Sequence, residues 1–147
     1  MQPNADRIEL LGFGVTYLHR ETDSGHALLG WDAPPRAGGI PVHVHERTEE
    51  GFYVLRGQLA LWRDGDVVVR GTGSYTVVRS GQQHSFWNPA DEPAAYLTAI
   101  VPPGIADYLR ELAQGLRDAQ SEEQATALRA RLSARYDFRV VGPPPPR

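Results

Sequence analysis

Three titratable side chains stand at the start of an apolar segment that reads HVHERTEEGFYVLRG over residues 43–57. His43 and His45 are two residues apart, so in a strand they lie on the same face. Glu50 begins the next apolar strand and shares a face with Phe52. Burying a carboxylate is costly unless a partner compensates its charge, and a divalent metal does this while using neutral imidazoles as ligands. A hairpin between the strands can therefore bring two histidines and one carboxylate around a metal ion.

A third histidine has a similar apolar context further along the chain. The segment at 73–88 reads GSYTVVRSGQQHSFWN, and its His84 lies on the same strand face as Phe86. His84 is therefore a further candidate for the same cluster. Two histidines on one strand face are a weak signal by themselves, but the carboxylate and another histidine in matching contexts make metal binding a specific prediction.

The first of these segments resembles the first motif of the cupin superfamily. That motif is His-x-His, three or four residues, Glu, six residues and Gly. In this chain His43 and His45 are followed by four residues, Glu50, six further residues and Gly57. The glycine that precedes the histidines in the family pattern stands one residue closer to them here, at Gly38.

The second segment resembles the second cupin motif, which is Gly, five residues, Pro, one residue, Gly, two residues, His, three residues and Asn. The chain matches it at Gly73, Gly81, His84 and Asn88, and Arg79 stands where the pattern has proline. The resemblance, which extends to the single-domain cupins described as quercetin-dioxygenase-like, implies one metal site with four protein ligands. These ligands are His43, His45, Glu50 and His84.

The elements that must position these ligands read as short strands separated by turn signals, from residue 7 to about residue 101. The strongest hairpin signal is LALWRDGDVVVRG, in which Asp64-Gly65 suits a two-residue type I′ turn between apolar strands. The fold class expected is mainly β, and the resemblance implies a cupin jelly roll or β-barrel.

A C-terminal helical extension is expected at about 104–136, because apolar residues from Ile105 to Leu116 recur at helical spacing. Ser121 is the expected N-cap of a second helix. The Pro-rich tail at 142–147 is expected to be flexible or polyproline-like and to pack little. We expect residues 1–147 to form a single cupin domain.

The composition narrows the chemistry further. The chain has 147 residues, of which 41% are hydrophobic and 22% charged, as in ordinary globular proteins. Cysteine and lysine are both absent, which excludes thiolate ligands, disulfides and Schiff-base chemistry. The net charge is −3 and the arginines form no basic patch, so no nucleic-acid partner is expected.

No membrane partner is expected either, because no apolar run approaches the length that spans a bilayer. The N-terminal stretch MQPNADRIELLGFG lacks a charged segment followed by an apolar one, so no secretory signal is visible. The expected compartment is the cytoplasm.

The function expected from this site is that of a metal-dependent oxygenase, which would use dioxygen on a small phenolic or enolic substrate. Glu50 is the catalytic candidate, as a base toward a substrate hydroxyl, and the substrate-pocket candidates are Phe52, Phe86 and Trp62. The sequence does not choose among iron, manganese, nickel, copper and zinc, and zinc would support only Lewis-acid chemistry.

Two alternatives stay open. The same site can serve an isomerase, cyclase or lyase in a biosynthetic pathway, or it can capture a small molecule without catalysis. The resemblance also implies a homodimer, formed through the strand face opposite the ligands, where Tyr53 and Leu55 lie.

Overall fold

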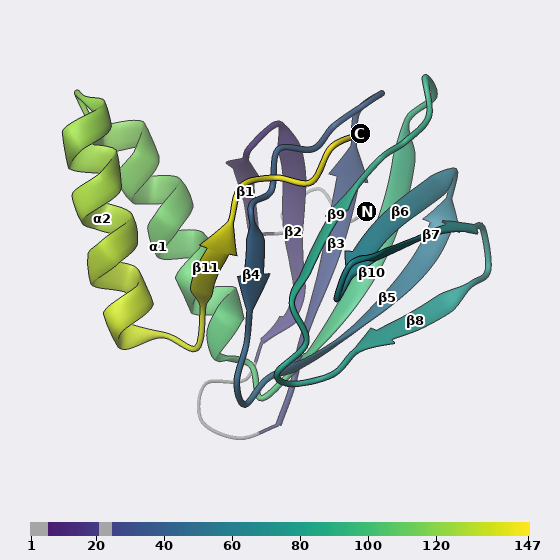
Figure 1. Cartoon of the computed structure of the whole chain (residues 1–147), viewed down its shortest axis with the longest axis horizontal. Coiled ribbons are helices and arrows are strands. Elements are labelled where there is room, and N and C mark those ends of the chain that lie inside the picture. The colour runs from purple at the N-terminus through teal and green to yellow at the C-terminus, as the bar shows by residue number, and fades with distance from the viewer. Residues whose placement is uncertain (1–5, 21–24) are drawn as a thin grey trace.

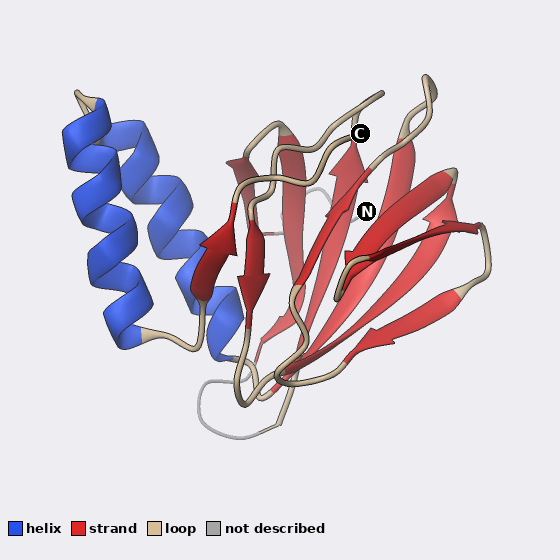
Figure 2. Cartoon of the chain, viewed as in Figure 1, coloured by secondary structure: helices blue, strands red, loops and turns tan. Residues whose placement is uncertain are grey.

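The computed structural model describes residues 6–20 and 25–147, which form two β-sheets and two C-terminal helices (Figures 1 and 2). The first five residues, part of the stretch in which no secretory signal was expected, lie outside the described residues. The mainly β class with C-terminal helices, which the turn signals and helical periodicity predicted, is confirmed.

The first sheet has six antiparallel strands, and it carries the carboxylate candidate. Its spatial order is β1 (Asp6–Leu10), β2 (Phe13–Arg20), β3 (Ala27–Ala33), β10 (Ala94–Val101), β5 (Glu49–Arg56) and β8 (Tyr75–Val78). Along β5, Glu50, Phe52 and Val54 are buried, whereas Tyr53 and Leu55 are exposed. This alternation is the two-residue period expected of a strand with one face in the core.

The second sheet has five strands, and it carries the histidines. Its order is β11 (Arg139–Gly142), β4 (Val42–Val44), β9 (His84–Trp87), β6 (Gln58–Arg63) and β7 (Asp66–Gly71). Among the described residues the strands pair into two separate sheets, so the closed barrel that the sequence suggested as one possibility is not formed. The arrangement is the jelly-roll alternative, a sandwich of two facing sheets.

The hairpin between β6 and β7 has the predicted turn. Asp64 has φ 49° and Gly65 has φ 98°, which are the positive values that a type I′ turn needs. The flanking Arg63 and Asp66 are directly paired. The turn residues therefore set the register of this edge of the second sheet.

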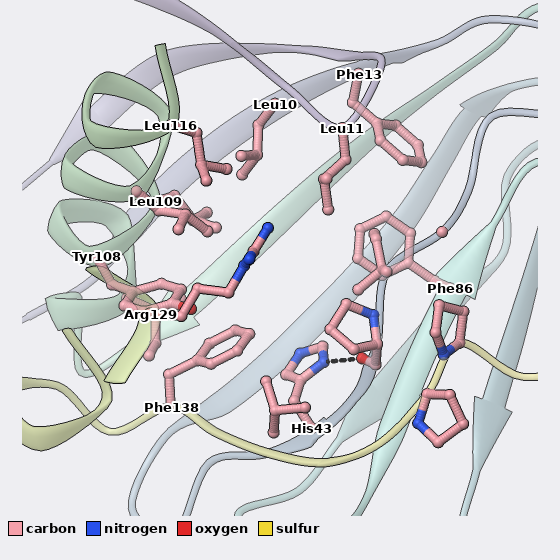
Figure 3. A pocket seen from close by; sticks show the side chains of 18 of the residues that line it. Leu10, Leu11, Phe13, His43, Phe86, Tyr108, Leu109, Leu116, Arg129 and Phe138 are labelled. Carbon is pink, nitrogen blue, oxygen red and sulfur yellow. Dashed lines mark hydrogen bonds between the residues drawn. The ribbon is translucent and has the colours of Figure 1, made fainter. Parts of the chain in front are cut away.

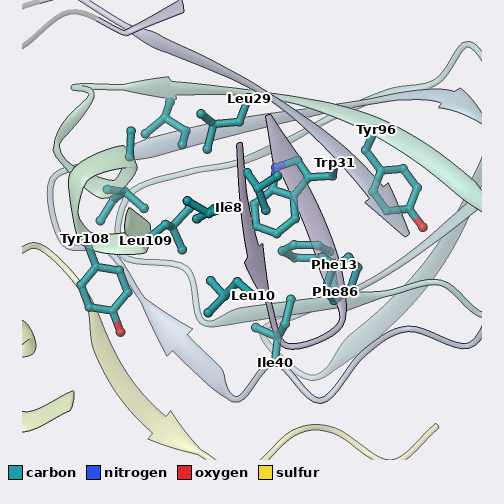
Figure 4. Close-up of a cluster of buried hydrophobic side chains, with 14 of the residues drawn as sticks. Ile8, Leu10, Phe13, Leu29, Trp31, Ile40, Phe86, Tyr96, Tyr108 and Leu109 are labelled. Atoms are coloured by element: carbon teal, nitrogen blue, oxygen red, sulfur yellow. The ribbon is translucent and has the colours of Figure 1, made fainter. Parts of the chain in front are cut away.

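The hydrophobic core fills the space between the sheets (Figure 4). Phe13 and Trp31 of the first sheet pack with Phe86 of the second, and Phe86 lies edge-on to Trp31 with ring centroids 5.2 Å apart. Such aromatic pairs stabilise the core beyond the area that they bury. The metal-ligand candidates lie on strands that this core holds in place, or, in the case of His45, directly after one.

The helices α1 (Gly104–Asp118) and α2 (Glu122–Arg135) stand at the side of the sandwich where the edge strands β1 and β11 lie (Figure 1). α1 buries Ile105 and Leu109 against the sheets, and the Ser121 side chain accepts a hydrogen bond from Gln124 N at 3.1 Å, as the expected N-cap. None of the described helices has both the length and the apolar character that crossing a membrane requires.

The Pro-rich tail packs more than its composition suggested. Pro145 is buried, and the Arg147 guanidinium donates a hydrogen bond to the backbone carbonyl of Arg36 at 2.9 Å. Val42 N also donates to Pro143 O at 3.4 Å, next to the β4–β11 pair. The tail therefore extends the edge of the second sheet, an arrangement that depends on long-range contacts and leaves no local sequence signal.

Candidate metal centre

Three histidines meet inside the sandwich. His43 on β4 is directly paired with His84 on β9, and His45 is the residue directly after the end of β4. All three side chains are buried, and one nitrogen of each lies within 4.8 Å of one nitrogen of the others. The strand period that placed His43 and His45 on one face thus brings them to the same point, and the antiparallel register adds His84.

The carboxylate of Glu50 reaches the same point from the opposite sheet. Its Oε2 lies 3.2 Å from His84 Nε2, and its Oε1 lies 3.5 Å from His45 Nε2. The structure therefore brings together all four residues that the cupin resemblance implied as ligands.

Each imidazole is oriented by a hydrogen bond from its Nδ1 atom to a backbone carbonyl. The three Nδ1 contacts are His43 to Pro41 O at 2.8 Å, His45 to Asp137 O at 2.7 Å and His84 to Gln82 O at 3.0 Å. A carbonyl oxygen only accepts, so Nδ1 carries the proton in each ring and Nε2 offers its lone pair in the neutral imidazole. Metal-binding histidines are commonly held in this way.

The cluster is short of a positive charge at its centre. Neutral His84 Nε2 and the Glu50 carboxylate are both acceptors, and they face each other across 3.2 Å. The buried His45 Nε2 has no hydrogen-bond partner among the described residues. A proton can relieve one of these contacts, whereas a divalent cation satisfies the lone pairs of all the groups together. The residues therefore fit a metal ion, and the three histidines can bind one.

The electrostatic environment of the cluster favours neutral His43 and ionised Glu50. Burial, reinforced by the neighbouring His84 and His45, lowers the pKa of His43 well below its ordinary value. Burial alone would raise the pKa of Glu50, but the adjacent His45, together with His84, holds that pKa well below its usual range. Burial opposes a charge on His45, yet the adjacent Glu50 carboxylate raises the pKa of His45 overall.

Asp137, which the sequence analysis did not single out, holds the loop between the ligands. Its carboxylate accepts hydrogen bonds from Glu46 N at 2.7 Å, Arg47 N at 2.8 Å and the Thr48 hydroxyl at 2.8 Å. Its backbone carbonyl accepts the His45 Nδ1 hydrogen bond. Burial would raise the pKa of Asp137, but these hydrogen bonds lower it. One residue near the C-terminus therefore positions both His45 and the turn that leads to Glu50.

Phe138, the next residue, supports the histidines from the side. Its ring stacks on His43 with centroids 4.4 Å apart and planes 10° apart, and its stacking on Tyr108 of α1 has centroids 4.1 Å apart. Residues 137–141 follow the helices, and a short segment of this kind carries no local signal for which strand it will join. β11 joins β4, and this pairing brings Phe138 to the site.

A cavity of about 560 Å³ opens next to the cluster, between the two sheets and the helices (Figure 3). Its volume is in the usual range for a small-molecule site. His43 and Glu50 line one end, and most of the remaining wall is apolar, with Phe13, Trp31 and Phe86 from the sheets.

The three pocket candidates from the sequence have different positions. Phe86 lines this cavity. Phe52 lies behind it, with its ring centroid 5.1 Å from that of Phe86. Trp62 is half-buried on β6, paired with Ser85, and is not among the residues around the cavity. Leu109 and Tyr108 of α1 line the wall instead.

Two residues of the motifs fix the backbone near the ligands. Asn88, fully buried, donates from its side-chain nitrogen to Glu92 O at 2.8 Å and accepts from Ala90 N at 3.0 Å, which holds the loop after β9. The turn before His84 forms although Arg79 replaces the family's proline, because Arg79 N donates to the Gln82 side chain at 2.9 Å.

The comparisons with known proteins agree with this architecture. Residues 31–100 match the family described as the cupin domain. Quercetin 2,3-dioxygenase of Bacillus subtilis (strain 168) is 37% identical over 91 residues, which are 62% of this chain and 26% of the relative. The aligned region thus spans about a quarter of that relative's length.

Solved structures share the fold at lower identity. A Klebsiella pneumoniae protein with a double-stranded β-helix domain has TM-score 0.53 and 22% identity, covering 69% of this chain and 82% of its own. A variant of Streptomyces PAC13, a protein described as a nucleoside dehydratase, was solved with uridine and has TM-score 0.61 and 14% identity, covering 94% of this chain and 84% of its own. A cupin sugar phosphate isomerase from Silicibacter pomeroyi has TM-score 0.61 and 19% identity, covering 69% and 73%.

The chain has the double-stranded β-helix fold, in which two antiparallel sheets face each other, and its histidine cluster lies between them. Residues 31–100 of the chain match the cupin domain, as the two sequence motifs indicated.

Proposed function

We propose that the protein is a metal-dependent oxygenase that acts on a small phenolic or enolic substrate. The observation that carries this proposal is the orientation of three buried imidazoles, each tied through Nδ1 to a backbone carbonyl, toward one buried carboxylate. The 37% identity to a quercetin 2,3-dioxygenase over 91 residues supports oxygenation as the reaction.

In this proposal His43, His45, His84 and Glu50 hold one divalent ion. A redox-active ion such as iron, manganese, nickel or copper would supply an open coordination position and the electron transfer that oxygenation requires. Glu50 is the catalytic residue, because it is the buried carboxylate that lines the cavity and can take the proton of a substrate hydroxyl there.

The apolar wall has its own part in this proposal. Phe13, Trp31 and Phe86 bind the body of an aromatic substrate and keep bulk water away from the cluster. The helices belong to the same functional unit, because α1 contributes Tyr108 and Leu109 to the cavity. We therefore treat the helical extension as part of one cupin domain.

The test is oxygen consumption by protein loaded separately with iron, manganese, nickel or copper, using flavonols and simple catechols as substrates. Zinc-loaded protein is the control, because zinc has no accessible redox change and should consume no oxygen. The proposal fails if every metal binds and none supports oxygen uptake above the zinc control.

A lyase or isomerase is the second candidate. The observation that favours it is structural similarity over 94% of the chain to a protein described as a nucleoside dehydratase. In that case the cluster acts through charge and proton transfer alone. Turnover that continues in the absence of dioxygen and with zinc would identify this class, whereas an oxygenase requires dioxygen.

We also propose a homodimer formed through the outer face of the first sheet. Tyr53, Leu55 and Tyr75 lie on that face of β5 and β8 and are 38%, 46% and 60% exposed. Adjacent exposed apolar side chains of this kind mark protein interfaces. Sedimentation should give twice the chain mass, and a Leu55→Glu change should give the monomer mass; a wild-type monomer would refute the dimer.

A further inference from the structure

The cavity wall carries charged side chains besides the histidine cluster. α2 contributes Arg129 and Glu122 to the lining, and Figure 3 shows Arg129 beside Tyr108 and Phe138. Figure 3 shows the Arg129 side chain reaching from the helix toward the interior of the cavity. Among the described lining residues it is the one with a permanent positive charge.

The Arg129 guanidinium has unused donor capacity. Glu122 is its hydrogen-bond partner among the described residues, through a single Nη1 contact of 3.3 Å. A guanidinium has five N–H donors, so most of them are available to another acceptor. The Glu122 side chain is 85% exposed and that of Arg129 is 42% exposed, so this ion pair is weakened by solvent.

The charges that line the cavity select the charge of the ligand. In the proposed site the divalent ion offsets the Glu50 carboxylate, so one guanidinium stands beside one further carboxylate of the lining, that of Glu122. The guanidinium can pair with one negative charge, and the second charge of a dianion such as a phosphate monoester would face Glu122. A monoanion suits the site, and a carboxylate matches the planar fork of a guanidinium. The carboxylate of such a ligand can replace solvent-exposed Glu122 as the partner of Arg129 at little cost in free energy.

Building on the proposed function, we propose that the substrate is an amphipathic carboxylic acid. Its oxygenated end lies at Glu50 and the histidines, its apolar body lies along Phe86 and Leu109, and its carboxylate pairs with Arg129. Arg129 is then a specificity residue, which selects acids over neutral molecules of the same shape.

The test compares a catechol carboxylic acid, dihydrocaffeate, with its uncharged isostere, dihydrocaffeamide. Calorimetric titration of the zinc-loaded and the metal-free protein gives both affinities without turnover. Hydrogen bonds to charged groups correspond to about a tenfold change in affinity or more, so the wild type should prefer the acid by about tenfold. Arg129→Gln should reduce that ratio to about one in both forms of the protein.

Two further variants on α2 serve as controls. Arg131→Gln removes the same charge from an exposed position of the helix that does not line the cavity, and it should keep the wild-type preference. Glu122→Gln removes the competing carboxylate and should strengthen binding of the acid. Thermal unfolding of each variant verifies that the fold is intact.

The proposal is overturned if the wild type binds acid and amide equally, if the acid does not bind, or if Arg129→Gln keeps the preference. Oxygen uptake with both compounds at equal efficiency refutes the acid specificity and leaves the oxygenase standing. A preference for the acid that depends on Arg129, without oxygen uptake with any metal, refutes the oxygenase and leaves the acid site standing.

Discussion

Removing the Asp137 carboxylate should loosen the metal centre without touching any of its ligands. Asp137→Ala leaves the backbone carbonyl that orients His45, but it removes the acceptor of three hydrogen bonds from the loop between His45 and Glu50. That loop sets the position of both ligands. We therefore expect metal affinity and stability to fall together.

The size of the effect follows from the three contacts. The Thr48 residue is 3% exposed, so its hydroxyl loses a charged partner that water replaces poorly, whereas Glu46 and Arg47 are exposed residues. Hydrogen bonds to charged groups contribute about 1.5–3 kcal/mol each when buried, so one full and two partial losses give about 2–3 kcal/mol. For a chain of this size that lowers the Tm by about 5–10 °C.

The metal affinity should fall by about tenfold, the lower end of what is found when residues that orient ligands are changed. Chelator competition with zinc measures it, and thermal unfolding of the metal-free protein measures stability separately. Asp137→Asn keeps one carbonyl acceptor and should show a smaller loss. Asp91→Ala, which breaks only the exposed pair with Arg36, should change neither quantity. An Asp137→Ala protein with wild-type zinc affinity would refute the positioning role.

Two further changes test the surroundings of the site. Phe138→Ala removes the ring that stacks on His43 and Tyr108, and it should cost about 2–4 kcal/mol in denaturant unfolding, whereas Phe138→Leu should cost less. An unchanged unfolding midpoint for the alanine variant would contradict this packing. Gly57→Ala should destabilise by about 1–3 kcal/mol, because Gly57 has φ 78° and an added Cβ would lie 2.9 Å from that of Ala94. A neutral Gly57→Ala change would show that the backbone relaxes there.

Strand period accounts for much of what the sequence could predict about the site. The two-residue alternation placed His43 with His45 and Glu50 with Phe52 on inward faces, and the structure buries all four. The Asp-Gly turn and the Ser121 cap are likewise local signals, each depending on residues a few positions apart. The two cupin motifs added His84, which alternation alone could not have joined to the other ligands.

The parts that could not be predicted depend on contacts between distant residues. The Asp137 carbonyl accepts a hydrogen bond from His45, which lies 92 positions earlier in the sequence. No local pattern indicates that an aspartate will contact the loop between His45 and Glu50. Trp62 was expected in the pocket but does not line the cavity, because the local sequence does not determine which face of its strand turns toward the cavity. Arg129 lines the cavity because of the way α2 packs beside α1, and the helical repeat of the sequence does not determine that packing.

The most direct test of the central claim is the metal content of the purified protein after loading and desalting. The account predicts about one divalent ion per chain, lost in His84→Ala and retained in His26→Ala, a change at an exposed histidine stacked on His19 away from the cluster. X-ray absorption of the loaded protein should show imidazole nitrogens together with oxygen around the ion. Wild-type protein that retains no ion, or His84→Ala protein that retains as much as the wild type, would contradict it.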